Sequence, residues 1–463
     1  MKLDRVEITY FRCFETLTIP FQPDVNVFVG VNGSGKSSIL DAIAIVLWNI
    51  IEANGGGGTR QRRMQGVALR PSDIHVPPES PDVLSGRRDF VQIRAKAKDF
   101  YEVPGFPTMT SEGETTFIEW QDHIQFRPPN NFDYSNNQSN RLSQIYGYFD
   151  ALWQQMRTSG AKALIPLPVV TYYRAHRRFS EMPSLGDISS LNLDKEGAFR
   201  GALNAGMTYE AMCQWLYLRE NQELREKLQV RDDKAYELPD LKAIRRAISN
   251  TIENVERVYF DANPPSLKVA MKEPKGTPKI LELEQLSDGY RNLLAIVLDF
   301  ARRLAQANPG WDNPLEAPGI LLIDEIELHL HPKWQQTVIP CLRKAFPNTQ
   351  MIVTTHSPQV LTTVQSEKVF ILKDQKLFSP PPEIYGAESK RVLEQVFDTE
   401  SRPPDNENSE KVRELFGFIN KGDLKKAAEV CSILINTMGP GEPALIEAQT
   451  IIRNRQWEKE LGL

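Results

Sequence analysis

The sequence lacks the features of a secreted, membrane-spanning or disulfide-stabilised protein. Only four cysteines occur among 463 residues, they lie far apart, and no two form a CxxC pair. They therefore indicate free thiols in a reducing compartment. The chain has no run of 18 apolar residues, and its first residues form no apolar signal region. These absences predict a cytoplasmic protein.

An extreme charge is missing as well. The formal net charge is −5 at pH 7, with 25% charged and 41% hydrophobic residues. Such values are ordinary for a folded globular protein and argue against a wholly basic nucleic-acid binder, although a local basic patch stays open. The length predicts roughly two to four domains with a large buried core.

A glycine-rich stretch, GVNGSGKSS at residues 30–38, follows a short apolar run. Its spacing, GxxxxGKS, is that of a Walker A phosphate loop. We expect Lys36 to reach the β- and γ-phosphates and Ser37 to hold Mg²⁺. Apolar residues then recur at helical spacing, so a helix is predicted to start here and to present its N-terminus to the phosphates. The residues assigned to nucleotide binding in this loop are Gly30, Asn32, Gly33, Ser34, Gly35, Lys36, Ser37 and Ser38.

Two carboxylates follow a second apolar run at residues 319–323. Such a run is typical of a central parallel strand buried on both faces, and doubly wound sheets bind ligands at the carboxyl ends of their strands. We therefore predict that Asp324 holds Mg²⁺ through water and that Glu325 orients or polarises the attacking water. Another apolar strand, at residues 351–355, ends in His356. This histidine is predicted to contact the γ-phosphate or the attacking water.

A serine and a glycine begin a further predicted helix. In the sequence LSDGYR at residues 286–291, Ser287 and Gly289 precede an apolar helical pattern, so they lie at an anion-binding helix N-terminus. The order of Walker A, an LSxG signature, Walker B with a following glutamate, and a switch histidine resembles the ABC-type ATPases. That resemblance implies two heads enclosing two ATP molecules, with Ser287 and Gly289 acting in trans. A homodimer or higher homo-oligomer is therefore expected.

Other motifs resemble the soluble RecF, Rad50 and OLD branch of these ATPases. The sequence ITYFRCF at residues 8–14 looks like their opening strand, whose arginine, here Arg12, reaches nucleotide phosphate. The sequence ELHLHP at residues 327–332 is similar to their dimer-interface loop. His329 and His331 form an HxH pair, but no third ligand is evident, so a structural role is favoured over a metal site.

Over residues 1–50 and 280–365 the chain is similar to the PtuA-type ATPases of Septu anti-phage systems, including retron-associated ones. The motifs that carry this resemblance are LSDGYR at 286–291, IDEIELHLHPKWQ at 323–335 and TTHSP at 354–358. It implies ATP and Mg²⁺ as ligands and a separate PtuB-like HNH nuclease as partner. Nucleic acid, such as retron msDNA with its reverse transcriptase, is a further candidate partner, and no membrane is expected. A RecF-like DNA-repair ATPase without a nuclease partner stays open as the alternative.

No nuclease motif is evident in the chain itself. After His356 there is no DxD pair of the kind that a TOPRIM nuclease needs for its metals, and the six histidines form no HNH arrangement. The sequence therefore predicts an ATPase with no nuclease site of its own, and the resemblance to PtuA implies that a separate partner cuts nucleic acid.

The predicted fold is α/β: an ABC-type P-loop ATPase head, a mixed β-sheet with helices, carrying an inserted helical subdomain and a C-terminal helical segment. Helical periodicity extends over residues 208–258, far too short for a long coiled-coil arm. Short amphipathic helices are expected at residues 392–397, 411–420 and 424–436, where the segment docks a partner or simply packs. The predicted divisions are an N-terminal lobe with Walker A and a β-rich insertion at 1–205, the helical insertion at 206–262, a lobe with signature, Walker B and switch histidine at 263–380, and the C-terminal segment at 381–463.

Two basic stretches leave alternatives open. Arg60, Arg62 and Arg63 follow four glycines, and a solvated insertion is favoured there over a contact with DNA or a partner. The sequence RAHRR at residues 174–178 follows a predicted buried strand. It could bind phosphates or form a solvent-facing loop.

Overall fold

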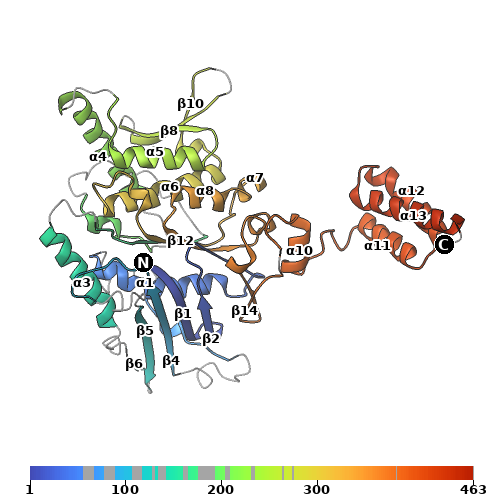
Figure 1. Ribbon diagram of the computed structural model, residues 1–463, viewed down its shortest axis with the longest axis horizontal. Helices are drawn as coiled ribbons and strands as arrows, with labels where there is room; N and C mark the ends of the chain where they lie inside the picture. The colour runs from blue at the N-terminus through green and yellow to red at the C-terminus, as the bar shows by residue number, and fades with distance from the viewer. Residues whose placement is uncertain are drawn as a thin grey trace. The chain divides into compact units, whose positions relative to one another are not determined.

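The structure is a computed structural model, and it divides the chain into two compact units, Met1–Glu388 and Ser389–Leu463 (Figure 1). The residues that it describes are 1–55, 67–77, 89–106, 117–127, 131–133, 142–159, 165–175, 193–203, 209–230, 235–262, 265–273, 276–381 and 383–461. The basic residues Arg60, Arg62, Arg63 and those at 176–178 lie outside these ranges.

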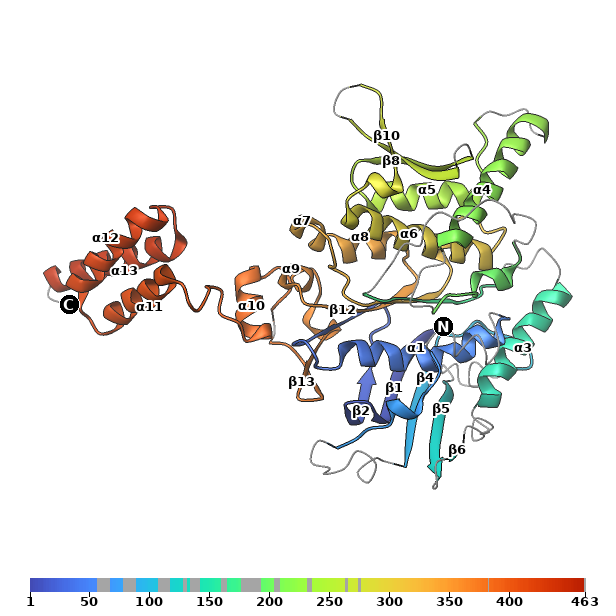
Figure 2. The same cartoon turned by 180° about the vertical axis from the view of Figure 1, so that it is seen from behind.

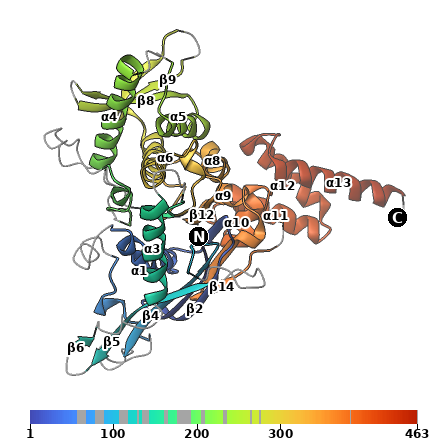
Figure 3. The same cartoon turned by 60° about the vertical axis from the view of Figure 1, so that its left-hand side comes forward.

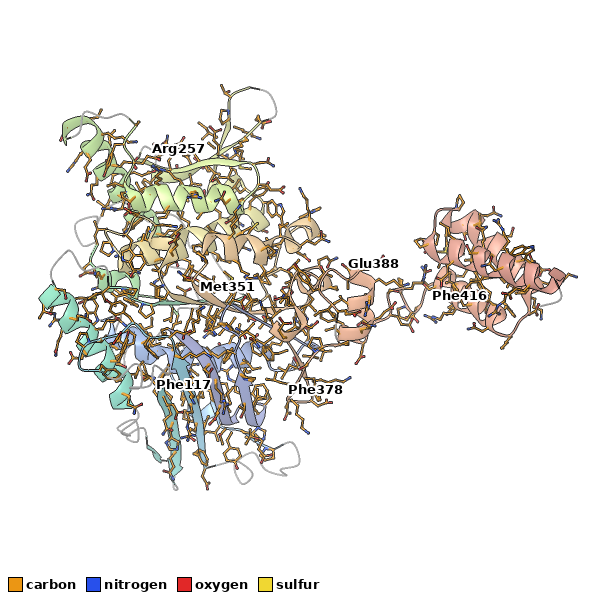
Figure 4. All side chains as sticks on the ribbon, viewed as in Figure 1. Phe117, Arg257, Met351, Phe378, Glu388 and Phe416 are labelled. Atoms are coloured by element: carbon orange, nitrogen blue, oxygen red, sulfur yellow. The ribbon has the colours of Figure 1, made fainter. Side chains whose placement is uncertain are left out.

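A six-stranded sheet forms the centre of the first unit, in the order β14-β13-β3-β12-β11-β7. Its strands are β3 (Val25–Val29), β7 (Val169–Tyr173), β11 (Gly319–Ile323), β12 (Thr349–Thr355), β13 (Val369–Lys373) and β14 (Lys376–Phe378). All neighbours are parallel except β13 and β14. Every residue of β3, β7, β11 and β12 is buried, including Met351 (Figure 4), as expected for parallel strands covered on both faces. The carboxyl ends of these strands therefore meet at one edge.

The edge strand β7 ends in two adjacent tyrosines whose hydroxyls reach opposite layers. Tyr172 donates a hydrogen bond to Asp41 over 3.2 Å, and Tyr173 donates one to Asp299 over 2.8 Å. Successive side chains of a strand point to opposite faces, so the two contacts lie on the two sides of the sheet. β7 thus connects the helix that carries Asp41 with the helix that carries Asp299.

An antiparallel sheet in the order β2-β1-β4-β5-β6 forms a second layer. Its strands are β1 (Lys2–Phe11), β2 (Phe14–Pro20), β4 (Phe90–Lys98), β5 (Ile118–Arg127) and β6 (Asn131–Asp133). Helix α1 (Lys36–Ala53) contacts strands of both sheets and lies across β1 and β4 in Figure 2. Because it is covered on both sides, α1 has apolar residues around most of its circumference. Helix α3 (Leu142–Ser159) packs on α1 and β5.

The signature helix α6 (Asp288–Ala307) lies in a helical layer with α5 (Pro239–Thr251) and α8 (Val338–Ala345), where α5 contacts both neighbours (Figure 3). Helix α4 (Tyr209–Arg225) continues into a π-helical turn at Glu226–Val230. A three-stranded sheet, β10-β9-β8, comprises β8 (Val255–Ala262), β9 (Pro265–Met271) and β10 (Lys279–Glu282). The helix predicted up to residue 258 is therefore wrong at its end, because Val255 and Val258 pair with β9.

The second unit consists of helices α10 (Ser389–Phe397), α11 (Glu407–Asn420), α12 (Leu424–Met438) and α13 (Pro443–Leu461). Leu415, Leu434 and Leu445 form the centre of its core, and Phe416 packs against it (Figure 4). The side chains of Asn406 and Asp423 cap the starts of α11 and α12. Within the described ranges of the whole chain, none of the helices combines the length and apolar character needed to cross a membrane.

Candidate nucleotide site

A cavity of about 310 Å³ opens at the carboxyl edge of the central sheet. Its volume is within the range of small-molecule sites. The Walker A loop and the start of α1, the turn between β1 and β2, and the ends of β11 and β12 supply its walls. The lining residues are Arg12, Cys13, Asn32, Gly33, Gly35, Lys36, Ser37, Ser38, Asp324, Glu325 and His356. Gly30 and Ser34 belong to the same loop but are not among these lining residues.

The glycines of the loop are required by its geometry. Gly33 and Gly35 have φ angles of 79° and 105°, in the left-handed region that favours glycine. A Cβ on Gly35 would lie 2.6 Å from the ring of Phe14, and one on Gly30 would lie 2.5 Å from the carbonyl oxygen of Leu372. Both approaches are too short for any side chain, so neither position can hold another residue without moving the loop.

The loop offers the groups that a phosphate needs. The ammonium of Lys36 donates hydrogen bonds of 2.9 Å to the carbonyl oxygens of Gly30 and Val31. Burial lowers the pKa of Lys36, against the opposing charges of Asp324 and Glu325. The buried hydroxyl of Ser34 has no hydrogen-bond partner among the described residues. The Lys36 ammonium, which lines the cavity at the N-terminus of α1, fits a bound anion.

Asp324 and Glu325 are positioned by Thr354 at the end of β12. The Thr354 hydroxyl donates a hydrogen bond of 2.6 Å to Asp324 Oδ1 and accepts one of 2.8 Å from the backbone N–H of Glu325. Glu325 has a φ of 49°, so the chain turns sharply directly after β11. The Asp324 carboxylate and the Ser37 hydroxyl provide oxygen ligands of the kind that Mg²⁺ prefers, and both line the cavity.

His356 lies at the end of β12, on the same wall. Its backbone N–H donates a hydrogen bond of 2.6 Å to Glu327 Oε1, and the hydroxyl of Thr355 donates one of 2.7 Å to Glu327 Oε2. Burial, and next the charge of Lys36, lower the pKa of His356. The lowered pKa favours the neutral imidazole, which can either donate or accept a hydrogen bond.

Arg12 lines the cavity with its guanidinium held by two carboxylates. It donates hydrogen bonds of 2.6 Å to Asp41 and 2.9 Å to Asp73. The backbone of Arg12 has a φ of 50°, and its carbonyl oxygen lies 2.6 Å from His75 Nδ1. The segment around residues 70–75 therefore fixes both the backbone and the side chain of Arg12 at the wall of the cavity.

Sequence reasoning missed several residues that hold this site together: Asp41, Asp73, Thr354 and Glu327. Two of them had a visible signal. Thr354 directly follows the apolar run before His356, and Glu327 is the third carboxylate of the DEIE sequence. Asp41 and Asp73 had none, because nothing in the spacing shows that a residue of α1 and a distant short turn converge on Arg12.

The signature residues lie elsewhere in the first unit. Ser287 stands at the N-terminus of α6, and neither it nor Gly289 is among the described residues that line the cavity. A Cβ on Gly289 would lie 2.5 Å from the carbonyl oxygen of His329, so the signature packs tightly on the segment that follows β11. The rings of Tyr290 and Trp334 meet edge to face, with centroids 4.1 Å apart. The action of Ser287 and Gly289 in trans stays a prediction.

The two histidines of the HxH pair lie directly before a short helix. The ring of His331 accepts a hydrogen bond of 3.3 Å from the backbone N–H of Lys333 and so caps the short helix α7 (Pro332–Gln335). Among the described residues, no group of three or more histidine, cysteine, aspartate or glutamate side chains has an arrangement that could hold a metal ion. His329 is exposed and has a φ of 63° in the turn before α7.

The Walker A loop and this cavity are those of a P-loop nucleotide-binding protein. A family model described as an AAA domain matches residues 5–257, more than half of the chain, and the chain belongs to this family. A second family model, described as "AAA domain, putative AbiEii toxin, Type IV TA system", matches residues 171–362. The predicted α/β head with a C-terminal helical segment is confirmed.

Particular relatives are retron and Septu proteins. The chain is 42% identical over 182 residues to "Retron Ec83 probable ATPase" of Escherichia coli, which is 39% of this chain and 34% of the relative. It is 38% identical over 176 residues to "Retron Vc95 probable ATPase" of Vibrio cholerae serotype O1 biovar El Tor, 37% of this chain and 33% of the relative. "Septu protein PtuA" of Bacillus mycoides (strain KBAB4) is 39% identical over 95 residues, 20% of this chain and 13% of the relative. The predicted resemblance to PtuA-type and retron ATPases is confirmed, and the matches span about a third or less of these relatives.

Among solved structures, the SmcHead bound to the C-winged helix domain of ScpA is similar to this chain with a TM-score of 0.47 and 19% sequence identity. The similarity covers 82% of this chain and 98% of that one.

Proposed function

We propose that the chain is an ATP-binding and ATP-hydrolysing ABC-type ATPase subunit of an anti-phage defence complex, which regulates a separate PtuB-like HNH nuclease through ATP-dependent head dimerisation. The observation that carries the ATPase part is the gathering of Lys36, Ser37, Asp324, Glu325 and His356 around one cavity. The relatives named as retron ATPases and PtuA support the defence role.

In this proposal each residue of the cavity has a separate task. Lys36 and the loop N–H groups bind the β- and γ-phosphates of ATP. Ser37 and Asp324 would hold Mg²⁺, which when bound neutralises charge on the phosphates. Glu325 orients the attacking water, and the neutral imidazole of His356 forms a hydrogen bond with that water or with the γ-phosphate. Arg12 is the remaining cation at the wall and is proposed to contact phosphate.

The position of the signature supports the proposed dimerisation. Ser287 and Gly289 are not part of the cavity formed by their own chain, so a partner head would bring its signature to the bound ATP. ATP would then close the dimer, and hydrolysis would reopen it. The C-terminal segment at residues 381–463, which includes the helical unit Ser389–Leu463, is the proposed docking segment for the nuclease or a further subunit. We propose domain boundaries after residues 205, 262 and 380. With these boundaries the signature, Walker B and the switch histidine belong to one lobe, residues 263–380.

Capture of partners tests the complex. Tagged Glu325→Gln protein, purified from its native host with ATP and Mg²⁺, should retain bound ATP and a stoichiometric small HNH protein. Glu367→Gln, which changes an exposed carboxylate of the same unit, is the matched control for hydrolysis. A lone homodimer whose ATPase is stimulated by DNA would contradict the nuclease partner and favour a RecF-like repair ATPase.

Turnover tests the assignment of roles. Glu325→Gln should reduce kcat about 10²- to 10⁴-fold, the range for removing a general base, while ATP still binds. Lys36→Ala should instead abolish binding, measured with a fluorescent ATP analogue. If the Glu325→Gln variant still protected cells against phage, hydrolysis would not be needed, and the chain would act as a nucleotide-binding scaffold.

A further inference from the structure

Glu327 joins the two segments that carry the proposed catalytic residues Glu325 and His356. Its carboxylate accepts the backbone N–H of His356 at 2.6 Å and the hydroxyl of Thr355 at 2.7 Å. We propose that Glu327 is a positioning residue for ATP hydrolysis, which holds the start of the loop after β12 and thereby sets the imidazole of His356 against the attacking water. This inference rests on the proposed function.

The backbone of Glu327 is itself held rigidly. Leu328 N–H donates to the carbonyl oxygen of Glu325 over 3.0 Å, and Leu330 N–H donates to that of Glu327 over 2.8 Å. These two successive turns fix the segment, and the buried side chain of Ile326 anchors it. The Ile326 N–H also donates to the carbonyl oxygen of Thr354 over 3.1 Å. The carboxylate therefore starts from a fixed position relative to β12.

A carboxylate suits this place because two donors converge on it. The N–H of His356 lies just beyond the last residue of β12, where the ladder to a neighbouring strand has ended, and a polar group there needs another partner. Charge-assisted hydrogen bonds are shorter and stronger than neutral ones, in agreement with the two short distances. Alanine would remove both acceptors at once.

Hydrogen bonds of Gln335 join the same two segments further along the chain. The hydroxyl of Ser357 donates to Gln335 Oε1 over 2.6 Å, and Gln335 Nε2 donates to the carbonyl oxygen of Leu330 over 2.8 Å. Glu327 thus holds the backbone of His356, and Gln335 holds the next residue, Ser357. Without Glu327 the Gln335 link would still hold the loop in place, but the backbone of His356, which sets the position of the imidazole, would lose its hydrogen bond.

Steady-state ATP hydrolysis by the full chain tests this role. Glu327→Ala should lower kcat roughly 10- to 100-fold, because a misplacement of about 1 Å has effects of this size, and should leave KM for ATP nearly unchanged. Glu327→Gln should keep most of the activity. Its amide oxygen can accept from His356, and its NH₂ group can donate to the Thr355 hydroxyl, which is also an acceptor. Glu367→Ala is the control for loss of a carboxylate.

A double-mutant cycle separates positioning from a merely structural role. If Glu327 acts through the imidazole, adding Glu327→Ala to His356→Ala should cost no further activity. The inference would be overturned if the two losses of kcat multiplied in the double variant, or if Glu327→Ala kept the wild-type kcat. The ATPase proposal would stand in either case. Absence of hydrolysis in the wild-type chain would overturn both. Should Glu327→Ala fail to fold, Thr355→Val removes one of the two hydrogen bonds, and its smaller loss should again vanish in the His356→Ala background.

Discussion

Asp299 of the signature helix offers the sharpest test of what stabilises the first unit. Its carboxylate accepts hydrogen bonds from Arg302 at 2.7 Å and from Arg303 and Tyr173 at 2.8 Å each. The side chains of Asp299, Arg302 and Arg303 are only 4%, 3% and 2% exposed. Burial alone would raise the pKa of Asp299, but the two guanidinium groups hold it well below its usual range. The ionised carboxylate therefore lies against two buried cations and balances their charge.

Replacing this carboxylate by an amide should destabilise the unit strongly. Removing one partner of a buried ion pair costs about 3–5 kcal/mol, because the remaining charges stay buried without compensation. With an m-value near 3 kcal/mol per M, Asp299→Asn should lower the urea midpoint by roughly 1 M or more. Tyr173→Phe removes only one hydrogen bond to the charged group and should cost about 1.5–3 kcal/mol.

Urea unfolding followed by tryptophan fluorescence measures these differences, with the exposed Asp312→Asn as the control. The folded pKa of Asp299 is lowered, so its contribution is complete above the ordinary aspartate pKa of about 4 and is lost only as the pH falls through the lower folded value. The difference between wild type and Asp299→Asn should therefore stay constant from pH 8 to pH 5. A midpoint for Asp299→Asn equal to that of the control would refute the reasoning.

Other predictions concern single positions. Gly35→Ala should abolish ATP binding in equilibrium titrations, because its φ of 105° and the Phe14 ring exclude a Cβ, whereas Gly417→Ala, in an open part of α11, should raise stability by about 0.5–1 kcal/mol in thermal melts. Alkylation of Cys13, which lines the cavity, should block ATP binding, and ATP should protect it; because burial raises the pKa of Cys13, labelling should still accelerate above pH 9. Leu434→Ala should destabilise the helical unit by about 2–5 kcal/mol and lower the temperature of its calorimetric transition alone. A shift in the transition of residues 1–388 would contradict the expectation that the two units unfold independently.

Much of the fold could be predicted from local patterns of apolar residues in the sequence. The apolar runs at residues 319–323 and 351–355 are buried parallel strands, as predicted, because a strand covered on both faces needs apolar residues without alternation. The helix ending near residue 258 was mispredicted since Val255 and Val258, three residues apart, fit a helical period. In the structure both are buried in β8, which has a register shift between Val255 and Arg257 where it pairs with β9. Helix α13 was missed because its polar and apolar residues do not segregate clearly along the sequence.

The site was predictable where one short motif carries one task. The loop at residues 30–38, the Asp324–Glu325 pair and His356 each follow a strand, and parallel strands bring such ends together. The residues that orient them were not predictable, since they act across the sheet: Thr354 holds the turn after β11, and Asp73 holds Arg12 from 61 positions away. Their partners are decided by strand order and not by spacing.

The paired tyrosines of β7 bear on how faithfully this edge strand finds its register. Its sequence, VVTYY, is buried on both faces, so hydrophobicity alone would tolerate a slip by one residue. Such a slip would turn both hydroxyls to the wrong side, away from Asp41 and Asp299, and would leave buried polar groups unsatisfied. The two carboxylates thus favour the native register of β7 against β11, because in that register both tyrosine hydroxyls have buried partners.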